Sequence, residues 1–380
     1  MGKIVRVDFN TDILQELKEQ KPDIWTMYAA KEPKLSQWAT GEAKPTVNQL
    51  EKIAKKFHIP FGYFFLNELP ERESPIPHFR TKEGDTFKPS DNLLETIETL
   101  MRRQEWIEDI LLDWGEEKLN FASSVTLDTP IEETVDIIRK ILNIENGWAR
   151  DMPTWTNAFR FLRERTEEAK IFTVVNGVVN NNTRRKLDVN EFRGFVLYND
   201  IAPFVFINNN DAISGKIFTI VHEIVHILLG KSASFDLREL QSSDNEIELY
   251  CNKCTAEFLV PKADLLKEFD QTGLDYNLLA GIFKVSSIVI ARRLLDLGKI
   301  TKKEFHEFYR DHIAQDYKVQ KGNGGNFYNT VPTRLSKRFI SIITKAAHRN
   351  DILYRDAFKI TGLKADTFDK LEIARDMRGR

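Results

Sequence analysis

One apolar run constrains the fold of this 380-residue chain more than any other feature. It extends from Ile217 to Gly230 and reads IFTIVHEIVHILLG, apolar nearly all round and ended by a glycine. A glycine commonly follows the last turn of a helix, and a helix that is apolar on every side lies in a core. We therefore predict a buried helix here, although it carries two histidines and a glutamate.

Those polar residues form the pattern His222-Glu223-Ile224-Val225-His226. Histidines four residues apart share one face of a helix and can hold one zinc ion, and the glutamate between them then lies beside the metal. Each polar side chain would cost several kcal/mol if it were buried without a partner. A shared ligand is the simplest explanation, and the alternative is a chance match or a site that has lost its metal.

Catalytic zinc needs a third protein ligand and an open position for water. The segment from Asn245 to Pro261 predicts a second helix with two eligible carboxylates, Glu246 and Glu248. The face of Glu248 contains Cys251, Thr255 and Leu259, and the face of Glu246 contains Leu249, Tyr250, Lys253 and Glu257. The face of Glu248 is small and apolar, whereas the mixed face of Glu246 is typical of a solvated surface, so we choose Glu248. The alternative is that both are surface carboxylates of an amphipathic helix.

This chemistry predicts a peptide hydrolase. Zinc activates water, so Glu223 can take a proton from the attacking water and pass it to the leaving amine. An extended substrate is expected to pair with the edge of a sheet formed by strands at 192–199 and 203–208. Asn252, one turn past Glu248, is a candidate for orienting a ligand or for a capping or solvent role. Candidates for stabilising the oxyanion, none of them preferred, are Arg193, Tyr198, Tyr250 and His312.

Cys251 and Cys254 form a C-x-x-C pair, a spacing that also serves zinc ribbons and thiol redox sites. The chain has no second pair to complete a four-thiolate site, and these two lie within a helix. We therefore interpret them as small buried residues and expect no disulfide framework. No signal peptide and no apolar stretch of membrane-spanning length is recognisable, so we expect a cytoplasmic protein without membrane contacts.

Two strings of the chain resemble the ImmA/IrrE family of metallo-endopeptidases. They are FTIVHEIVHILLG and ELYCNKCTAEFLVP, in that order, and the resemblance extends from about Arg193 to Pro261. It implies that His222, His226 and Glu248 ligate the metal and that Glu223 is the catalytic carboxylate. Two departures, Ile224-Val225 and Cys254, do not involve a ligand.

The N-terminal part resembles a Cro/repressor-type helix-turn-helix. Ser36, Trp38, Gly41, Pro45 and Thr46 match the segment that ends the recognition helix and opens the next helix, which we predict at 47–57. Asp23 is expected to cap a preceding helix. The turn before the recognition helix is several residues short, so the module either contacts operator DNA or persists as a partner interface. The candidate DNA contacts are Lys34, Ser36, Gln37, Thr40 and Lys44.

The predicted fold is mainly α with a small β-sheet. We expect a helix-turn-helix domain at 1–69, a linker at 70–90, a zincin-like (gluzincin-type) peptidase domain at 91–300 with its core at 171–262, and a C-terminal helical module at 301–380. The formal net charge of −2 gives no global attraction to nucleic acid, so any DNA binding must be local. A second helix-turn-helix cadence at 278–294 is interpreted as packing, and 318–328 as a loop.

Two functional classes compete. The first is a zinc endopeptidase that cleaves a regulatory protein of the repressor or antitoxin type. The second is a transcriptional regulator or antitoxin that binds DNA or protein and uses the zinc fold as a scaffold or sensor. The intact pattern favours the first class, because a scaffold has no need of Glu223.

Overall fold

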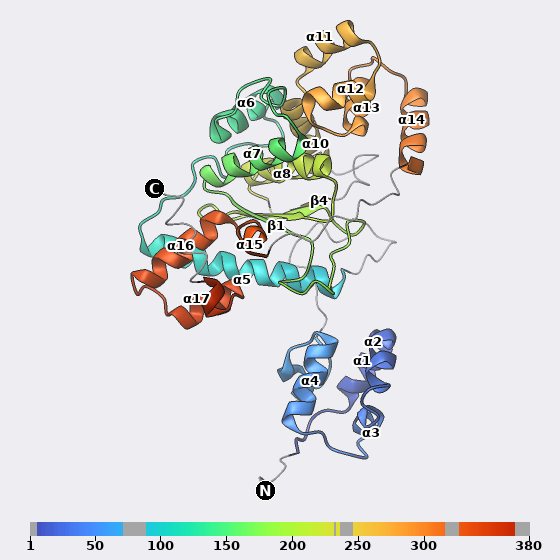
Figure 1. Cartoon of the computed structure of the whole chain (residues 1–380), viewed down its shortest axis with the longest axis vertical. Coiled ribbons are helices and arrows are strands. Elements are labelled where there is room, and N and C mark those ends of the chain that lie inside the picture. The colour runs from blue at the N-terminus through green and yellow to red at the C-terminus, as the bar shows by residue number, and fades with distance from the viewer. Residues whose placement is uncertain (1–5, 71–88, 232, 236–245, 316–326, 369–380) are drawn as a thin grey trace. The chain divides into compact units, whose positions relative to one another are not determined.

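The computed structural model describes residues 6–70, 89–231, 233–235, 246–315 and 327–368. It divides the chain into two compact units, residues 1–73 and 74–380 (Figure 1). Most of the linker predicted at 70–90 and most of the loop predicted at 318–328 lie outside the described residues.

The first unit is helical. Its elements are α1 (Asp12–Gln20), α2 (Pro22–Ala29), α3 (Leu35–Ala39), α4 (Val47–Phe57) and the 3-10 helix η1 (Phe61–Phe65). The apolar faces of these helices enclose a core in which Trp38 and Phe57 are almost completely buried. The helix predicted at 47–57 is confirmed, and Thr46 caps it through a reciprocal capping box with Gln49.

The predicted cap of α2 is wrong. Asp23 lies inside the first turn, and α2 begins at Pro22 without any side-chain cap. The physical reason is that proline suits the first helical position, where its missing N–H would have no intrahelical partner. The helix therefore starts earlier than a cap at Asp23 would require.

The second unit contains a mixed four-stranded sheet. Its strands are β1 (Phe172–Asn176), β2 (Gly194–Leu197), β3 (Phe204–Asn208) and β4 (Ala233–Phe235). Their order across the sheet is β1-β3-β2-β4, with β1 parallel to β3 and the other pairs antiparallel. The two central strands, β3 and β2, thus have a neighbour on both sides.

The two faces of the sheet carry side chains of different size. Alternate residues of a strand point to opposite faces. Large rings point to one face, where Phe172 stacks on Phe204 at a centroid distance of 4.6 Å and Phe195 on Phe206 at 4.9 Å. Smaller side chains point to the other face, among them Val175, Val196, Val205 and Ile207. The smaller residues let a helix approach the sheet closely on that side.

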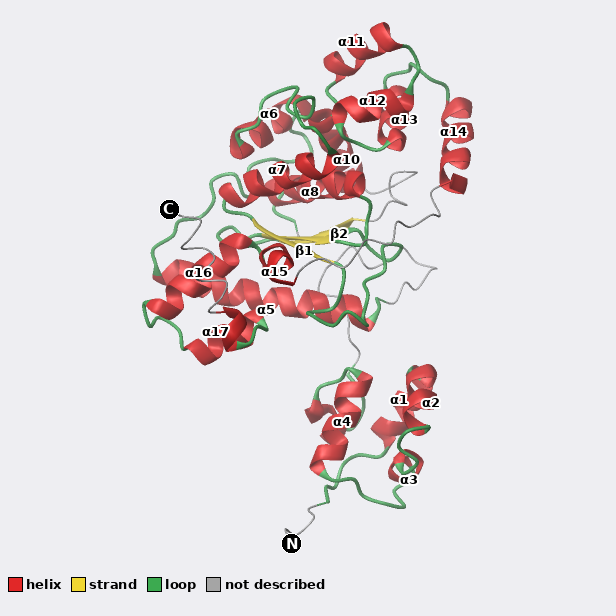
Figure 2. Ribbon diagram, viewed as in Figure 1, coloured by secondary structure: helices red, strands yellow, loops and turns green. Residues whose placement is uncertain are grey.

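Helices cover both faces (Figure 2). The face with the smaller residues shares a core with α6 (Ile131–Leu142), α7 (Trp155–Glu168), α8 (Ile213–Leu228), α10 (Glu246–Leu259), α12 (Tyr276–Phe283) and α13 (Ser287–Asp296). The phenylalanine face shares a core with α5 (Asp91–Asp113), α15 (Phe327–Leu335), α16 (Lys337–His348) and α17 (Tyr354–Thr361). The helices α11 (Lys262–Thr272) and α14 (Lys302–Gln315) complete the described elements.

The C-terminal helices are tied to the sheet and its helices. Glu167 of α7 accepts hydrogen bonds from the backbone N–H groups of Lys337 and Arg338, in the first turn of α16. Phe305 of α14 belongs to the same hydrophobic core as the apolar residues of α8, whereas α15 to α17 pack on the phenylalanine face. Residues after 300 therefore contribute to two different cores, and the predicted domain boundaries remain predictions.

The segment with a helix-turn-helix cadence forms α12 and α13. Arg293 is buried, pairs with Glu257 and donates from Nε to the carbonyl of Val260 at 3.2 Å. The guanidinium of Arg293 thus binds to other residues of the same unit. This agrees with the interpretation of residues 278–294 as a packing segment. In the part of the chain that the structure describes, no helix combines the length and apolar character needed to cross a bilayer.

The close approach of β2 to α8 can be tested at Gly194. A Cβ added there would lie 2.4 Å from Thr219 Cγ2 and 2.7 Å from the carbonyl oxygen of Phe206. We expect Gly194→Ala to destabilise the protein by about 1 to 3 kcal/mol through overpacking, measured by urea unfolding. Gly281→Ala in α12 is the control, because its Cβ would meet only Trp155 at 3.9 Å. An equal loss in both variants would contradict this account.

Candidate metal centre

The predicted apolar helix is α8, and its C-terminal end is held by a loop. Gly230 has a positive φ of 68°, as expected for a glycine that ends a helix. The backbone N–H groups of Ser123 and Val125 donate to the carbonyls of Ile227 and Leu228, both at 3.1 Å. These bonds satisfy carbonyl groups that have no partner within the helix. The last turn of α8, which carries His226, is thereby held in place.

The strand β2 passes beside Glu223. A Cβ built on Gly194 would lie 3.5 Å from Glu223 Oε1, so only a glycine brings the strand this near the carboxylate without a side chain between them. His222, Glu223 and His226 are all 0% exposed. The carboxylate of Glu223 is thus enclosed by the protein.

The helix α10 brings Glu248 to the two histidines. Its Oε2 lies 3.0 Å from Nε2 of His222, and its Oε1 lies 3.3 Å from Nε2 of His226. The two Nε2 atoms are 3.1 Å apart. The three side chains thus converge in a closed triangle, whereas Glu246 is exposed.

The triangle has dimensions that suit one metal ion. Ligand atoms about 2.1 Å from a tetrahedral zinc ion lie roughly 3.4 Å from one another. The two histidine nitrogens are 3.1 Å apart, and each lies 3.0 to 3.3 Å from a different oxygen of Glu248, which is close to that value. Two imidazoles and one carboxylate are also a donor set found in hydrolytic zinc sites. The residues present therefore fit a bound metal.

The protonation states of Glu248 and His226 also suit metal binding. Although burial opposes ionisation, the neighbouring His222 and His226 hold the pKa of Glu248 well below its usual value. Burial lowers the pKa of His226 below its usual 6.5, against the opposing effect of Glu248. An ionised carboxylate and a neutral imidazole are the forms that bind metal.

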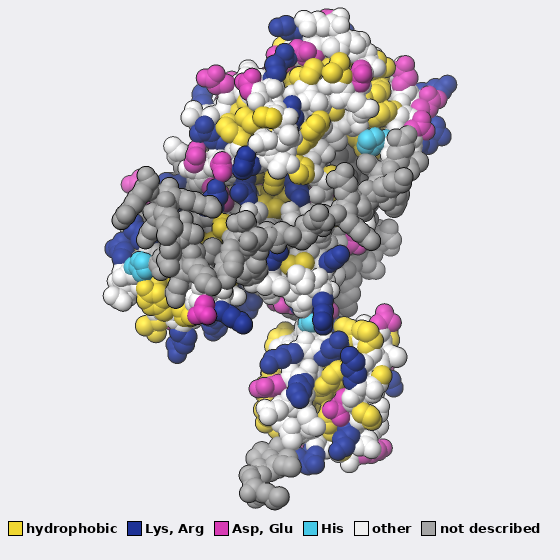
Figure 3. Space-filling view, viewed as in Figure 1, with side chains coloured by type: hydrophobic (Ala, Val, Ile, Leu, Met, Phe, Trp, Pro, Cys, Tyr) yellow, Lys and Arg dark blue, Asp and Glu magenta, His cyan; other side chains and the backbone are white. Residues whose placement is uncertain are grey.

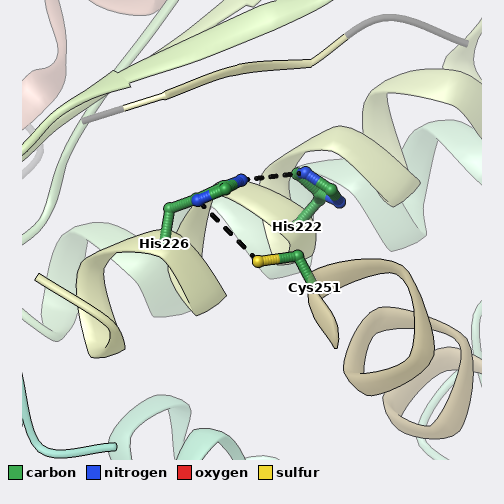
Figure 4. A group of neighbouring side chains, drawn as sticks. All are labelled: His222, His226 and Cys251. Atoms are coloured by element: carbon green, nitrogen blue, oxygen red, sulfur yellow. Dashed lines mark hydrogen bonds between the residues drawn. The ribbon is translucent and has the colours of Figure 1, made fainter. Parts of the chain in front are cut away.

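Cys251 contacts the other edge of one histidine ring. Its Sγ lies 3.7 Å from Nδ1 of His226, the nitrogen that faces away from His222 (Figure 4). Cys251 and the two histidines also have donor atoms within 4.8 Å of one another. Burial, together with the charge of Glu248, raises the pKa of the Cys251 thiol well above its usual value. Both cysteines are free and buried, as predicted, but the contact with His226 was not foreseen.

The structure places the oxyanion candidates in other interactions. Tyr250 bonds to Thr134 Oγ1 at 2.6 Å and to the carbonyl of Thr129 at 2.9 Å, so it is not part of a solvated face as predicted. Arg193 pairs with Asp211 at 2.5 Å. Tyr198 and His312 bond to Ser123 and Ser287 respectively.

Asn252 lies on α10 one turn after Glu248. Its Oδ1 is buried and has no hydrogen-bond partner among the described residues. No measured contact joins it to Glu248, so its role toward that ligand remains a prediction.

The prediction that the strands at 192–199 and 203–208 form an edge of the sheet is wrong. Strand β3 pairs with β1 and β2, and β2 pairs with β3 and β4, so neither central strand offers a free edge. The sequence patterns of the strands do not reveal the pairing order, and β4 adds a neighbour to β2. On this side of the sheet the outer strand is β4, which pairs with residues 194–196.

The candidate DNA contacts lie on or beside α3. Lys34, Ser36, Gln37, Thr40 and Lys44 are all exposed. Between them, Leu35, Trp38 and Ala39 face the core. Lys44 also pairs with Asp8. The predicted DNA contacts are thus exposed, and the residues between them are buried. The helix α3 itself is short and spans Leu35–Ala39.

Comparison with known proteins supports a peptidase-like domain around this site. Residues 167–295 match the family model of a peptidase domain described as the IrrE N-terminal-like domain. This range contains β1 to β3 and the helices α8 and α10. Residues 335–373 match a domain of unknown function. The comparisons with curated proteins and with solved structures gave no match.

Tyr250 provides a test of how α10 is held. We expect Tyr250→Phe to lower the free energy of unfolding by about 1 to 2 kcal/mol, because the buried hydroxyl of Thr134 loses its partner. The expected effect on metal affinity is nil, since the Tyr250 hydroxyl points to Thr134 and Thr129. Urea unfolding and zinc titration measure the two quantities. A variant of normal stability that binds zinc poorly would show that Tyr250 belongs to the metal centre.

Proposed function

We propose that this chain is a zinc-dependent endopeptidase that cleaves a regulatory protein of the repressor or antitoxin type. The observation that carries the proposal is the buried triangle of His222, His226 and Glu248, with the buried Glu223 next to His222 in the chain. The match of residues 167–295 to a peptidase family supports it.

The three side chains of the triangle would hold the metal. Zinc bound there supplies a Lewis acid that polarises a peptide carbonyl and activates water. Glu223 adjoins His222 in the chain, and its carboxylate would accept a proton from the attacking water at an Oε atom. It then donates that proton to the nitrogen of the departing amine. The buried surroundings exclude bulk water and strengthen these electrostatic interactions.

The peptide substrate is proposed to bind as an extended strand. An added strand gains affinity from main-chain hydrogen bonds, which an outer strand of the sheet can provide. The outer strand β4 pairs with β2, and β2 passes beside Glu223. A peptide on β4 would therefore lie near the carboxylate that cleaves it.

Glu223 tests catalysis separately from metal binding. We expect Glu223→Gln to keep zinc and to lose cleavage by roughly 10²- to 10⁴-fold, the usual contribution of a general base. Zinc content is measured by mass spectrometry, and cleavage is measured on repressor-type and antitoxin-type proteins encoded beside this chain. Cleavage at the wild-type rate by Glu223→Gln would refute the mechanism.

The two glutamates of α10 test the ligand set. Glu248 is buried within hydrogen-bonding distance of His222, whereas Glu246 is exposed two residues earlier. We expect Glu248→Ala to lose zinc and Glu246→Ala to retain it, measured by metal analysis after dialysis. The opposite result would refute the choice of Glu248.

A second function is proposed for the first unit, the recognition of operator DNA. It is supported by the exposure of the five polar residues on or beside α3. On the face seen in Figure 3, basic side chains of this unit are interspersed with acidic and apolar ones, so any attraction to DNA is local.

Lys34 tests this second function. Duplexes selected from a random library should bind the whole chain, and Lys34→Ala should weaken binding and reduce its salt dependence. Lys55→Ala, which removes an equally exposed charge from α4, is the control. Equal effects of the two variants would argue against recognition through α3. High operator affinity in a protein that binds no metal would favour the regulator over the peptidase.

A further inference from the structure

His226 is contacted on two different edges of its ring. Its Nε2 lies 3.1 Å from His222 Nε2 and 3.3 Å from Glu248 Oε1. Its Nδ1 lies 3.7 Å from the sulfur of Cys251 (Figure 4). The ring therefore stands between the metal centre and Cys251.

The chemistry of imidazole indicates which ring nitrogen of His226 carries the proton when the ring binds a metal. A neutral imidazole carries one proton, so a ring that offers the lone pair of Nε2 to a metal carries its proton on Nδ1. That N–H needs an acceptor, because an unsatisfied buried donor destabilises the fold. The structure places the Cys251 sulfur at hydrogen-bonding distance from this nitrogen, and both residues are 0% exposed.

We propose that Cys251 is a positioning residue for the metal centre. Its sulfur accepts a hydrogen bond from Nδ1–H of His226, which fixes the tautomer and the rotation of the ring and directs Nε2 toward the metal. Partners of this kind orient metal-bound histidines in many proteins, usually as carboxylates or backbone carbonyls. This inference rests on the proposed function, because it requires His226 to be a ligand.

Direct ligation by Cys251 is the rival explanation. The donor atoms of Cys251, His222 and His226 are close enough for a three-ligand group. However, Cys251 adjoins Nδ1 of His226, whereas His222 and Glu248 adjoin Nε2. The lone pairs of the two ring nitrogens diverge, so one ion cannot bind Nε2 and remain beside Cys251 in this arrangement. A thiol that merely fills space between α8 and α10 is the other explanation.

Zinc affinity separates positioning from packing. The full chain is titrated with zinc against a competing chelator as wild type, Cys251→Ala, Cys251→Ser and Cys254→Ala. We expect Cys251→Ala to weaken zinc binding roughly 10- to 100-fold. Cys251→Ser should bind more tightly than Cys251→Ala, because a hydroxyl oxygen can also accept from Nδ1–H. Cys254, whose thiol interacts with Tyr250 rather than His226, should tolerate alanine without loss.

Several outcomes of the titration would overturn the proposal. One is wild-type affinity in Cys251→Ala. Another is serine binding no better than alanine, which would indicate that the thiol only fills space. The metal-free variants are compared by circular dichroism and urea unfolding, so that affinity is assigned only to folded protein. If the alanine variant does not fold, the cobalt spectra of the wild type and the serine variant decide, and a sulfur-to-cobalt band in the wild type that is lost in Cys251→Ser overturns the proposal.

The spectrum of cobalt-substituted protein separates positioning from ligation. A thiolate bound to cobalt gives an intense sulfur-to-metal charge-transfer band in the near ultraviolet. We expect no such band in the wild type and the same visible cobalt bands in wild type and Cys251→Ser. A charge-transfer band that disappears in Cys251→Ser would overturn the proposal in favour of ligation.

The failure of this inference can be distinguished from that of the proposed function. If the wild type binds neither zinc nor cobalt, both fail. If the wild type binds zinc, Glu248→Ala does not, and Cys251→Ala binds as tightly as the wild type, only the positioning role of Cys251 fails.

Discussion

The second unit is organised around polar side chains that have been removed from water. His222, His226 and Glu248 are 0% exposed, and desolvating such groups is costly unless each finds a partner. They contact one another at 3.0 to 3.3 Å, and these contacts depend on the distance and rotation at which α8 and α10 pack. A shift of either helix would leave a buried carboxylate facing apolar atoms. The site therefore helps to determine the packing around it.

The sheet provides a firm base for α8. Its large aromatic rings point away from that helix, and its smaller valine and isoleucine side chains point toward it. Gly194, which begins β2, has no side chain, so this strand approaches α8 closely and passes beside Glu223. At the far end of α8, backbone N–H groups of residues 123 and 125 bond to the last carbonyls. The helix that carries the site is thus held along its length and at its end.

Much of this arrangement follows from sequence patterns. The apolar run with a terminal glycine predicts α8 and its burial, and helical phase selects Glu248 over Glu246 because only one of them shares a face with small residues. Two expectations failed because the answer depends on distant contacts. The strand β2 is not an edge, because β4 pairs with it. Tyr250 is not on a solvated face, because its hydroxyl bonds to Thr134 on another helix. Neither neighbour is visible in the local pattern.

The sequence by itself predicted which side chains converge, because helical periodicity places the two histidines on one face and Glu248 on the apolar face of the next helix. Only the tertiary structure decided how these faces meet. It turned the Nε2 edge of His226 toward His222 and Glu248 and its Nδ1 edge toward Cys251. The physical reason is that periodicity specifies the direction of a side chain from its own helix axis, whereas the ring edge it presents depends on the packing of two helices against each other.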